Sequence, residues 1–177
     1  MNLANRLTIL RIVLTPVFIA AVLYKRLDAA LIIFMLAAVT DGLDGYIART
    51  RKEKTKFGAI MDPLADKMLI GSAFISFSMV TGLPGYLTMP VYVPIIVISR
   101  DVIILLGAMI IYLLAGRIDV KPTVTGKVTT FFQMLTVIMV LVQFVHSKWI
   151  WNTAVALTVI SGLDYIRIFS RQINEKL

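Results

Sequence analysis

The sequence predicts an all-α, polytopic membrane protein, because its apolar residues form long runs and its charged residues gather in short stretches between them. Hydrophobic residues make up 59% of the 177-residue chain and charged residues 16%, whereas soluble domains have roughly 45–50% and about 25%. The mean hydropathy is +0.88. Several runs approach the ~20 apolar residues that a helix needs to cross a bilayer. A soluble helical domain does not account for runs of this length.

Six apolar segments each predict one transmembrane helix. They cover residues 8–24, 29–48, 58–82, 90–115, 128–147 and 149–170. Charged or turn-forming stretches separate them, and Pro90 and Pro94 are expected to shorten or kink the fourth helix. No internal repeat or long linker divides the sequence, so residues 1–177 are expected to form one membrane domain.

The distribution of basic residues predicts which helix ends face the cytoplasm. If six helices alternate, both termini and the stretches 49–57 and 116–127 share one side. That side then holds Arg49, Arg51, Lys52, Lys54, Lys56, Arg117, Lys121, Lys127, Arg171 and Lys176. Because cytoplasmic loops are enriched in Lys and Arg, the protein is expected in the cell membrane with both termini in the cytoplasm. The net charge of +8 then reflects contact with anionic membrane lipids, and nucleic acid is not an expected partner.

Two residue types narrow the possible chemistry. The chain has no cysteine, which excludes disulfides, thiolate zinc sites and thiol nucleophiles. His146 is the only histidine, and the predicted topology places it on the far side of the membrane, so a covalent histidine route is disfavoured. The first apolar run contains Arg11 and no small-residue cleavage site, so it is expected not to be a cleaved signal peptide.

Four aspartates stand at the cytoplasmic ends of two neighbouring predicted helices. Asp41 and Asp44 share a helix face at spacing i, i+3, and Asp62 and Asp66 share one at i, i+4. Helices joined by a short loop tend to be antiparallel neighbours, so the four carboxylates are expected to converge on one pocket. A structural reading exists for single members, since Asp62 before Pro63 resembles an N-cap and Asp41 is within reach of Arg49.

Four carboxylates at this density repel one another unless a cation neutralises them. Oxygen-rich sites suit Mg²⁺ or Mn²⁺. Gly42, Gly45 and Gly58, with Ala48, are small residues beside these aspartates, and they indicate a close approach of the backbone by something bulky. The stretch therefore predicts a metal site beside a groove.

The full pattern resembles the signature of the CDP-alcohol phosphatidyltransferase family. Asp41, Asp44, Gly45, Ala48 and Arg49 are followed after eight residues by Gly58, Asp62 and Asp66, which matches all eight defining positions at the family's spacing. The resemblance implies a six-helix membrane enzyme with a cytoplasm-facing cavity that moves a phosphatidyl group from a CDP-linked lipid to an alcohol and releases CMP. A homodimer is likewise implied only by the resemblance.

The resemblance also assigns roles to single residues. It implies that the four aspartates bind two divalent ions, Mg²⁺ or Mn²⁺, and that Asp66 also acts as general base toward the acceptor hydroxyl. Arg49 is implied to contact the phosphates of CDP-diacylglycerol, for which a guanidinium is well suited. Gly45 and Gly58 are implied to line the cytidine pocket. Thr8, with Asn5 and Arg11, is expected to border the donor site.

Three softer matches bear on the acceptor alcohol. Residues 2–19, 98–104 and 126–134 resemble stretches of the bacterial phosphatidylglycerophosphate synthases, which implies sn-glycerol 3-phosphate as acceptor. Lys127, Arg167 and Arg117 are then candidates for binding the acceptor phosphate, although the positive-inside rule alone also explains basic residues at these places. Arg100 and Asp101 lie inside the fourth segment and are expected to face the bundle interior or a water-filled cavity.

Other functions stay open at the level of sequence. Phosphatidylinositol phosphate synthase is the next alternative, and phosphatidylserine synthase and a cardiolipin synthase follow. A divalent-cation transporter is the alternative from another class. It would more naturally carry its acidic residues at the bilayer midplane within inverted repeats, whereas here they cluster at one side.

Overall fold

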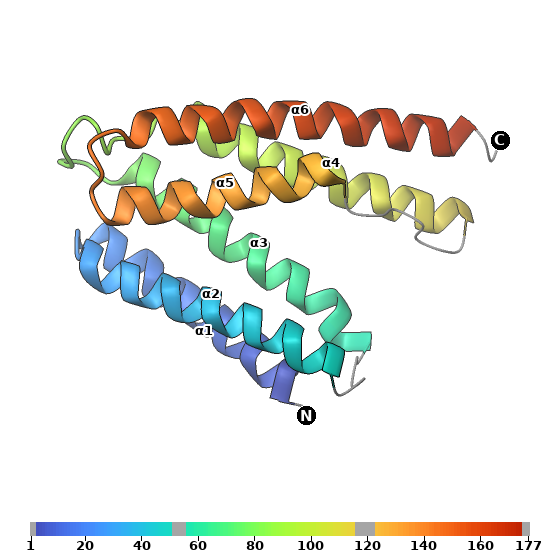
Figure 1. Cartoon of the computed structure of the whole chain (residues 1–177), viewed down its shortest axis with the longest axis horizontal. Coiled ribbons are helices and arrows are strands. Elements are labelled where there is room, and N and C mark those ends of the chain that lie inside the picture. Colours follow the sequence, from blue (N-terminus) through green and yellow to red (C-terminus); the bar gives the residue numbers. More distant parts are fainter. Residues whose placement is uncertain (1–2, 51–55, 116–122, 175–177) are drawn as a thin grey trace.

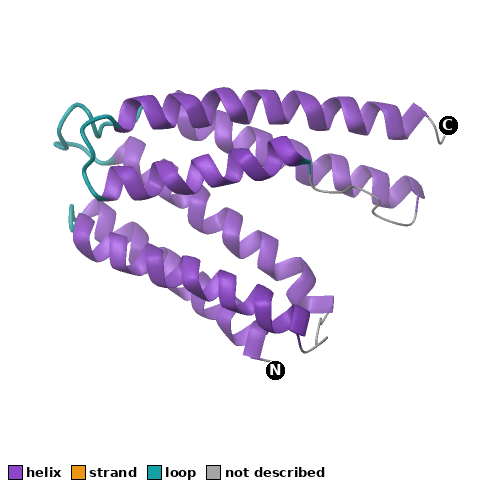
Figure 2. Ribbon diagram, viewed as in Figure 1, coloured by secondary structure: helices purple, strands orange, loops and turns teal. Residues whose placement is uncertain are grey.

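The computed structural model describes residues 3–50, 56–115 and 123–174, and within them the side chains of residues 7–40, 64–111, 113 and 123–172. The described chain is helical, with loops between the helices and no strands (Figure 2). Its helices are α1 (Leu3–Leu23), α2 (Leu27–Thr50), α3 (Lys56–Met79), α4 (Tyr92–Ala115), α5 (Val124–Leu141) and α6 (Ser147–Asn174). The prediction of a helix in each apolar segment is therefore confirmed, while the crossing of the membrane by all six stays a prediction.

Polar residues, rather than the ends of apolar runs, set several boundaries. Helix α5 begins earlier than predicted because Thr123 caps it: the Thr123 hydroxyl accepts a hydrogen bond from the Gly126 N–H at 3.0 Å. It ends at Leu141, before the apolar run is complete, and Gln143 follows with a positive φ of 57°. Pro94 lies in the first turn of α4, where its missing N–H leaves no helical hydrogen bond unmade.

The helical N-cap reading of Asp62 is wrong. Helix α3 already begins at Lys56, so Asp62 and Pro63 lie inside it. Likewise α2 runs through Gly42 and Gly45 as far as Thr50, so these glycines do not interrupt it. The basic stretch predicted as a loop over 49–57 is thereby divided, since Arg49 belongs to α2 and Lys56 to α3.

The helices form two packed groups that meet along α3. Helices α2 and α3 both pack against α1, while α4 and α5 both pack against α6. Figure 1 shows these groups diverging toward the end that holds the last turns of α2 and α4 and the first turns of α1 and α3. Helix α3 also contacts α4 and α5, but far less than it contacts α1. We call α1–α3 the aspartate group and α4–α6 the C-terminal group.

A hydrophobic core joins the two groups at the opposite end. Phe18, Phe34 and Phe77 are fully buried and come from α1, α2 and α3. The Phe18 ring centroid lies 5.9 Å from that of Phe34 and 6.5 Å from that of Phe77, which is the range of favourable aromatic pairs. Trp151 of α6 and Val137 of α5 belong to the same core cluster. This packing holds one end of the bundle together and leaves the other end to diverge.

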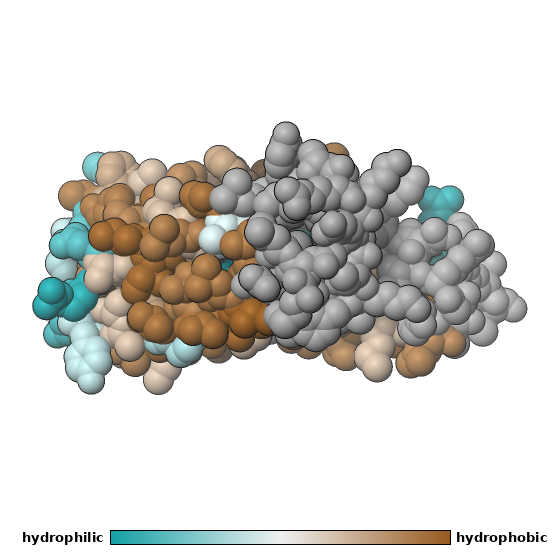
Figure 3. All heavy atoms as spheres, turned by 90° about the horizontal axis from the view of Figure 1, so that it is seen from below, coloured by the Kyte–Doolittle hydropathy of each residue, from teal (hydrophilic) through white to brown (hydrophobic). Residues whose placement is uncertain are grey.

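The outer surface carries many exposed aliphatic side chains. Val13 on α1, Ile32 on α2, Leu113 on α4 and Leu163 on α6 are each more than half exposed. Figure 3 shows hydrophobic side chains spread over one face and hydrophilic ones at the end that carries the loops between α1 and α2 and between α3 and α4. Apolar patches of this extent mark a membrane or partner surface rather than a water-facing one.

Length and hydropathy identify three of the described helices as able to cross a bilayer. These stretches are Tyr92–Ile111, Val124–Leu141 and Ser147–Gln172. Helices α1 and α2 contribute shorter apolar stretches, Leu7–Leu23 and Leu27–Thr40. The protein thus has the character of a helical membrane protein.

Candidate active site

The four aspartates lie on the two helices for which they were predicted. Helix α2 carries Asp41 and Asp44, and α3 carries Asp62 and Asp66. The last turns of α2 and the first turns of α3 lie at the same end of the molecule (Figure 1). The side chains of Asp41, Asp44, Asp62 and Arg49 lie outside the described residues, and so do the surroundings of Gly45 and Gly58. Asp66 is described, and it is half-buried.

Helix α1, which packs against α2 and α3, has a buried polar face. Thr8 and Arg11 share that face at spacing i, i+3, and their exposures are 1% and 0%. Arg11 and Asp66 lie at similar depths, about 12 and 15 Å from the starts of their helices at a rise of 1.5 Å per residue. A buried guanidinium requires polar or anionic surroundings, and the four aspartates of the predicted site lie on the two helices that pack against α1.

A separate basic pocket lies between α3 and the C-terminal group. Its volume is about 610 Å³, and its described lining includes Lys67, Arg100, Gly126, Lys127, Thr130 and Tyr165. Three of these residues are cations, and they come from α3, α4 and α5. Lys67 directly follows Asp66 in the sequence, so the pocket adjoins the helix that carries the predicted base. An anion is the ligand that this lining favours.

Arg100 is the best-fixed cation of the pocket. Its exposure is 6%, and its Nη1 donates to Asp101 Oδ1 at 2.8 Å while its Nη2 donates to Ser161 Oγ at 2.7 Å. The guanidinium carbon also lies 5.4 Å from the centroid of the Tyr165 ring, within cation–π range. The expectation that Arg100 faces the bundle interior is confirmed. Although neighbours on a helix point about 100° apart, Arg100 and Asp101 do pair.

The start of α5 closes the pocket from the other side. The Tyr165 hydroxyl accepts a hydrogen bond from the Thr123 N–H at 3.3 Å. Gly126 is buried, and a Cβ there would lie 3.0 Å from the Tyr165 hydroxyl and 3.2 Å from Arg100 Nη2. Only glycine therefore fits at this position without moving the pocket wall.

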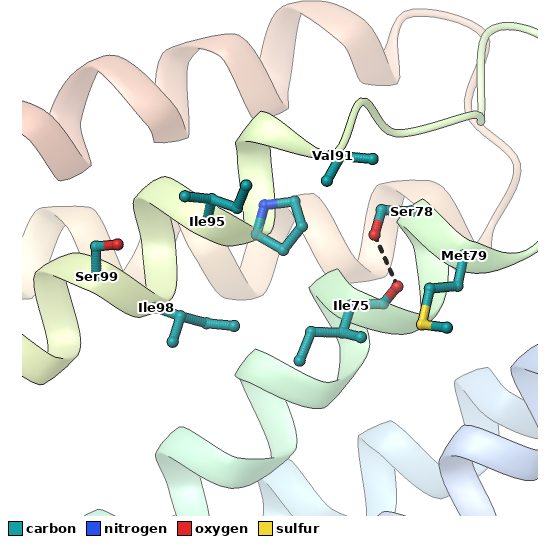
Figure 4. Close-up of a pocket in the computed structure, with 8 residues that line it drawn as sticks. Ile75, Ser78, Met79, Val91, Ile95, Ile98 and Ser99 are labelled. Carbon is teal, nitrogen blue, oxygen red and sulfur yellow. Dashed lines mark hydrogen bonds between the residues drawn. The ribbon is translucent and has the colours of Figure 1, made fainter.

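The hollow between α3 and α4 has a different character. It measures about 430 Å³ and is lined by Ile75, Ser78, Met79, Val91, Pro94, Ile95, Ile98 and Ser99 (Figure 4). The Ser78 hydroxyl donates to the carbonyl of Ile75 at 2.9 Å. The described lining holds no charged group, so this hollow lacks the cations that favour a phosphate and the carboxylates that favour a metal ion.

Comparison with known proteins assigns the chain to a family. Residues 1–160 match the sequence profile of the CDP-alcohol phosphatidyltransferases. The chain belongs to this family. It is an enzyme of the phosphatidyltransferase class, as the aspartate pattern implied.

The similarity to curated relatives extends over nearly the whole chain. A Mycobacterium tuberculosis protein named "Probable phosphatidylglycerophosphate synthase" is 36% identical over 98% of this chain and 84% of its own. A CDP-diacylglycerol–glycerol-3-phosphate 3-phosphatidyltransferase of Bacillus subtilis is 32% identical over 93% of each chain. One of the same name from Rickettsia felis is 33% identical over 94% of each chain.

The structure places the candidate acceptor residues of this phosphatidyltransferase at different sites. Lys127 lines the basic pocket near the start of α5. Arg167 lies on an exposed part of α6, outside the described pocket lining and about two turns from the end of that helix. Arg117 lies outside the described residues.

Sequence reasoning missed Lys67 and Tyr165. The position of Lys67 immediately after Asp66 was the available signal, because a cation beside a catalytic carboxylate is well placed to meet an anionic substrate. No local pattern pointed to Tyr165. Its hydroxyl reaches Thr123 across 42 positions of sequence, and such a contact follows from packing alone.

Proposed function

We propose that this protein transfers the phosphatidyl group of CDP-diacylglycerol to sn-glycerol 3-phosphate and so forms phosphatidylglycerophosphate and CMP. The observation that carries the proposal is the basic pocket beside the aspartate helix α3. A phosphorylated acceptor needs cations at its site, and Lys67, Arg100 and Lys127 supply them. The names of the curated relatives state the same reaction.

Asp66 is the proposed general base. It lies next to Lys67 on α3 and is half-buried, so it is able to accept the proton of an acceptor hydroxyl whose phosphate lies in the basic pocket. Losing a general base lowers turnover by roughly 10²–10⁴-fold. Asp66→Asn is expected to lower turnover by at least the smaller factor and to change the KM for CDP-diacylglycerol less.

The residues present fit a pair of divalent ions. Asp41, Asp44, Asp62 and Asp66 supply oxygen donors on two helices of one packed group, which is the donor chemistry that Mg²⁺ and Mn²⁺ prefer. Bound there, the ions would stabilise negative charge on the phosphate oxygens of the donor. Arg49 adds a cation on α2, about one turn after Gly45, and Gly58 lies in the first turn of α3.

The acceptor phosphate is proposed to contact Lys127, with Arg167 and Arg117 as further candidates from the sequence. Lys127 opens α5 one turn after Thr123, at the wall of the basic pocket. The predicted topology puts this end of all six helices at the cytoplasmic side. We also propose that the chain spans the membrane six times, that this cavity faces the cytoplasm and that the protein assembles as a homodimer.

A panel of acceptors tests the proposed reaction directly. Purified protein in lipid vesicles is given CDP-diacylglycerol, Mg²⁺ and one labelled acceptor at a time: sn-glycerol 3-phosphate, inositol 1-phosphate, serine or phosphatidylglycerol. We expect lipid-linked label only with sn-glycerol 3-phosphate. Equal or greater labelling with inositol 1-phosphate would assign the other phosphorylated acceptor, and labelling with serine would show that the basic pocket does not bind acceptor phosphate.

Lys127→Ala locates the acceptor site. Loss of one charge-assisted contact weakens binding by about 1.5–3 kcal/mol, so the KM for sn-glycerol 3-phosphate is expected to rise roughly tenfold or more, while the KM for CDP-diacylglycerol changes little. Arg167→Ala is expected to have the same direction of effect. Simultaneous neutralisation of Lys52, Lys54 and Lys56 is the matched control and is expected to change the acceptor KM only slightly.

A further inference from the structure

A polar bridge links the two helix groups beside the basic pocket. Lys67 Nζ donates to Asp101 Oδ1 at 2.9 Å, and Arg100 Nη1 donates to the same oxygen at 2.8 Å. Lys67 belongs to α3, and the other two residues belong to α4. We call this contact the Lys67–Asp101 bridge. This ion pair joins the aspartate group to the C-terminal group.

Arg100 fixes the α4 side of the bridge. Its second amino group is held by Ser161 on α6, its guanidinium lies against the Tyr165 ring, and its stem packs beside Gly162. A planar guanidinium held in this way has little freedom to turn. Because Asp101 Oδ1 accepts a hydrogen bond from it, the carboxylate is also held in one position.

Lys67 depends on that carboxylate for its own position. A lysine side chain is flexible and loses rotamer entropy when it is fixed. Its side chain is 26% exposed and lies at the pocket wall, whereas that of Asp101 is only 12% exposed. One carboxylate shared by two cations leaves a net positive charge. The ammonium of Lys67 therefore remains attractive to an anion in the pocket.

We propose that Asp101, oriented by Arg100, is a positioning residue that holds the Lys67 ammonium where it contacts the phosphate of the acceptor. The same bridge sets the spacing between the helix that carries Asp66 and the helices that form the pocket. This inference rests on the proposed function, because the ligand of the pocket is taken to be the phosphorylated acceptor.

Kinetics of single and double variants test the bridge. Asp101→Asn removes the charge but keeps the size of the side chain, and Lys67→Met removes the ammonium but keeps most of the apolar stem. Each is expected to raise the KM for sn-glycerol 3-phosphate roughly tenfold, as for loss of a charge-assisted contact, with little change in the KM for CDP-diacylglycerol. The double variant is expected to match Lys67→Met alone, because Asp101 acts through Lys67. Lys67→Arg, which keeps the charge, is expected to regain part of the acceptor affinity.

Tyr92→Phe is the matched control. The Tyr92 hydroxyl donates to Asn152 Oδ1 at 3.2 Å and also ties α4 to another helix, but at the first residue of α4, about 13 Å along the helix from Asp101. This variant is expected to keep both KM values. Thermal unfolding of every variant in detergent shows whether the fold is retained. If Asp101→Asn does not fold, the comparison of Lys67→Arg with Lys67→Met tests the inference instead.

Three results would overturn the inference. They are an unchanged acceptor KM in Asp101→Asn, equal increases in both KM values, or additive effects of Asp101→Asn and Lys67→Met. If Lys127→Ala raises the acceptor KM and Asp101→Asn does not, the positioning role is refuted and the proposed function stands. If the wild-type enzyme does not use sn-glycerol 3-phosphate at all, the proposed function itself fails.

Discussion

Replacing Gly126 with alanine is expected to disturb the basic pocket and lower stability together. The added Cβ would lie 3.0 Å from Thr123 Oγ1, 3.0 Å from the Tyr165 hydroxyl and 3.2 Å from Arg100 Nη2. All three neighbours are held by hydrogen bonds or by the helix cap. They are therefore unable to move away without breaking a contact.

Two opposing terms decide the size of the effect. Alanine favours a helix over glycine by about 0.8–1.0 kcal/mol, and overpacking a well-filled site costs about 1–3 kcal/mol. The net expectation is a loss of about 0–2 kcal/mol relative to wild type. Gly71→Ala on α3 is the matched control, because its added Cβ would meet only Ile98 Cγ1 at 3.9 Å, an ordinary contact. That variant is expected to gain up to about 1 kcal/mol.

The assay is equilibrium or thermal unfolding of both variants in the same detergent, combined with the acceptor KM. We expect Gly126→Ala to unfold more readily than Gly71→Ala and to bind sn-glycerol 3-phosphate more weakly. Equal stability of the two variants, with an unchanged acceptor KM for Gly126→Ala, would refute the tight packing described for the start of α5.

Three further predictions concern the α5–α6 contact, the metal site and the topology. Gln133 Nε2 donates to Thr158 Oγ1 at 3.1 Å between two fully buried side chains. Thr158→Val leaves the Gln133 amide without its acceptor and is expected to destabilise the protein by about 1–3 kcal/mol. Gln133→Leu is expected to destabilise it less, because Thr158 still donates to the Ala154 carbonyl, and the opposite order in unfolding experiments would contradict this reading. Chelation by EDTA is expected to abolish activity and Mg²⁺ or Mn²⁺ to restore it, so full turnover in excess EDTA would rule out the proposed ions. Since the chain has no cysteine, single cysteines can be labelled with an impermeant thiol reagent. A cysteine in place of His146 is expected to react only from outside, and one in place of Ser170 only from the cytoplasm. Reversed labelling would show that the topology is inverted.

The helices were predictable from the sequence because long apolar runs determine where helices form in this chain. It failed at the boundaries where a single polar residue decides, as at Thr123, which starts α5 before its apolar run begins. Asp62 was open to an N-cap interpretation because it precedes a proline, but α3 starts six residues earlier, at Lys56.

The candidate site likewise has one part that the sequence predicts and one part that it does not. The aspartates were predictable because their spacing along two helices is a property of the sequence. The Lys67–Asp101 bridge was not, since it joins residues 34 positions apart and depends on how α3 meets α4. The basic pocket combines side chains from α3, α4, α5 and α6, and only the three-dimensional arrangement brings them together.

In the proposed reaction, the phosphatidyl group passes directly from CDP-diacylglycerol to an acceptor bound in the basic pocket. The most direct test is to measure CMP release by the purified enzyme in vesicles with and without sn-glycerol 3-phosphate. The account predicts that CMP appears only with the acceptor and in an amount equal to the phosphatidylglycerophosphate formed. CMP release at an undiminished rate without any acceptor would contradict it.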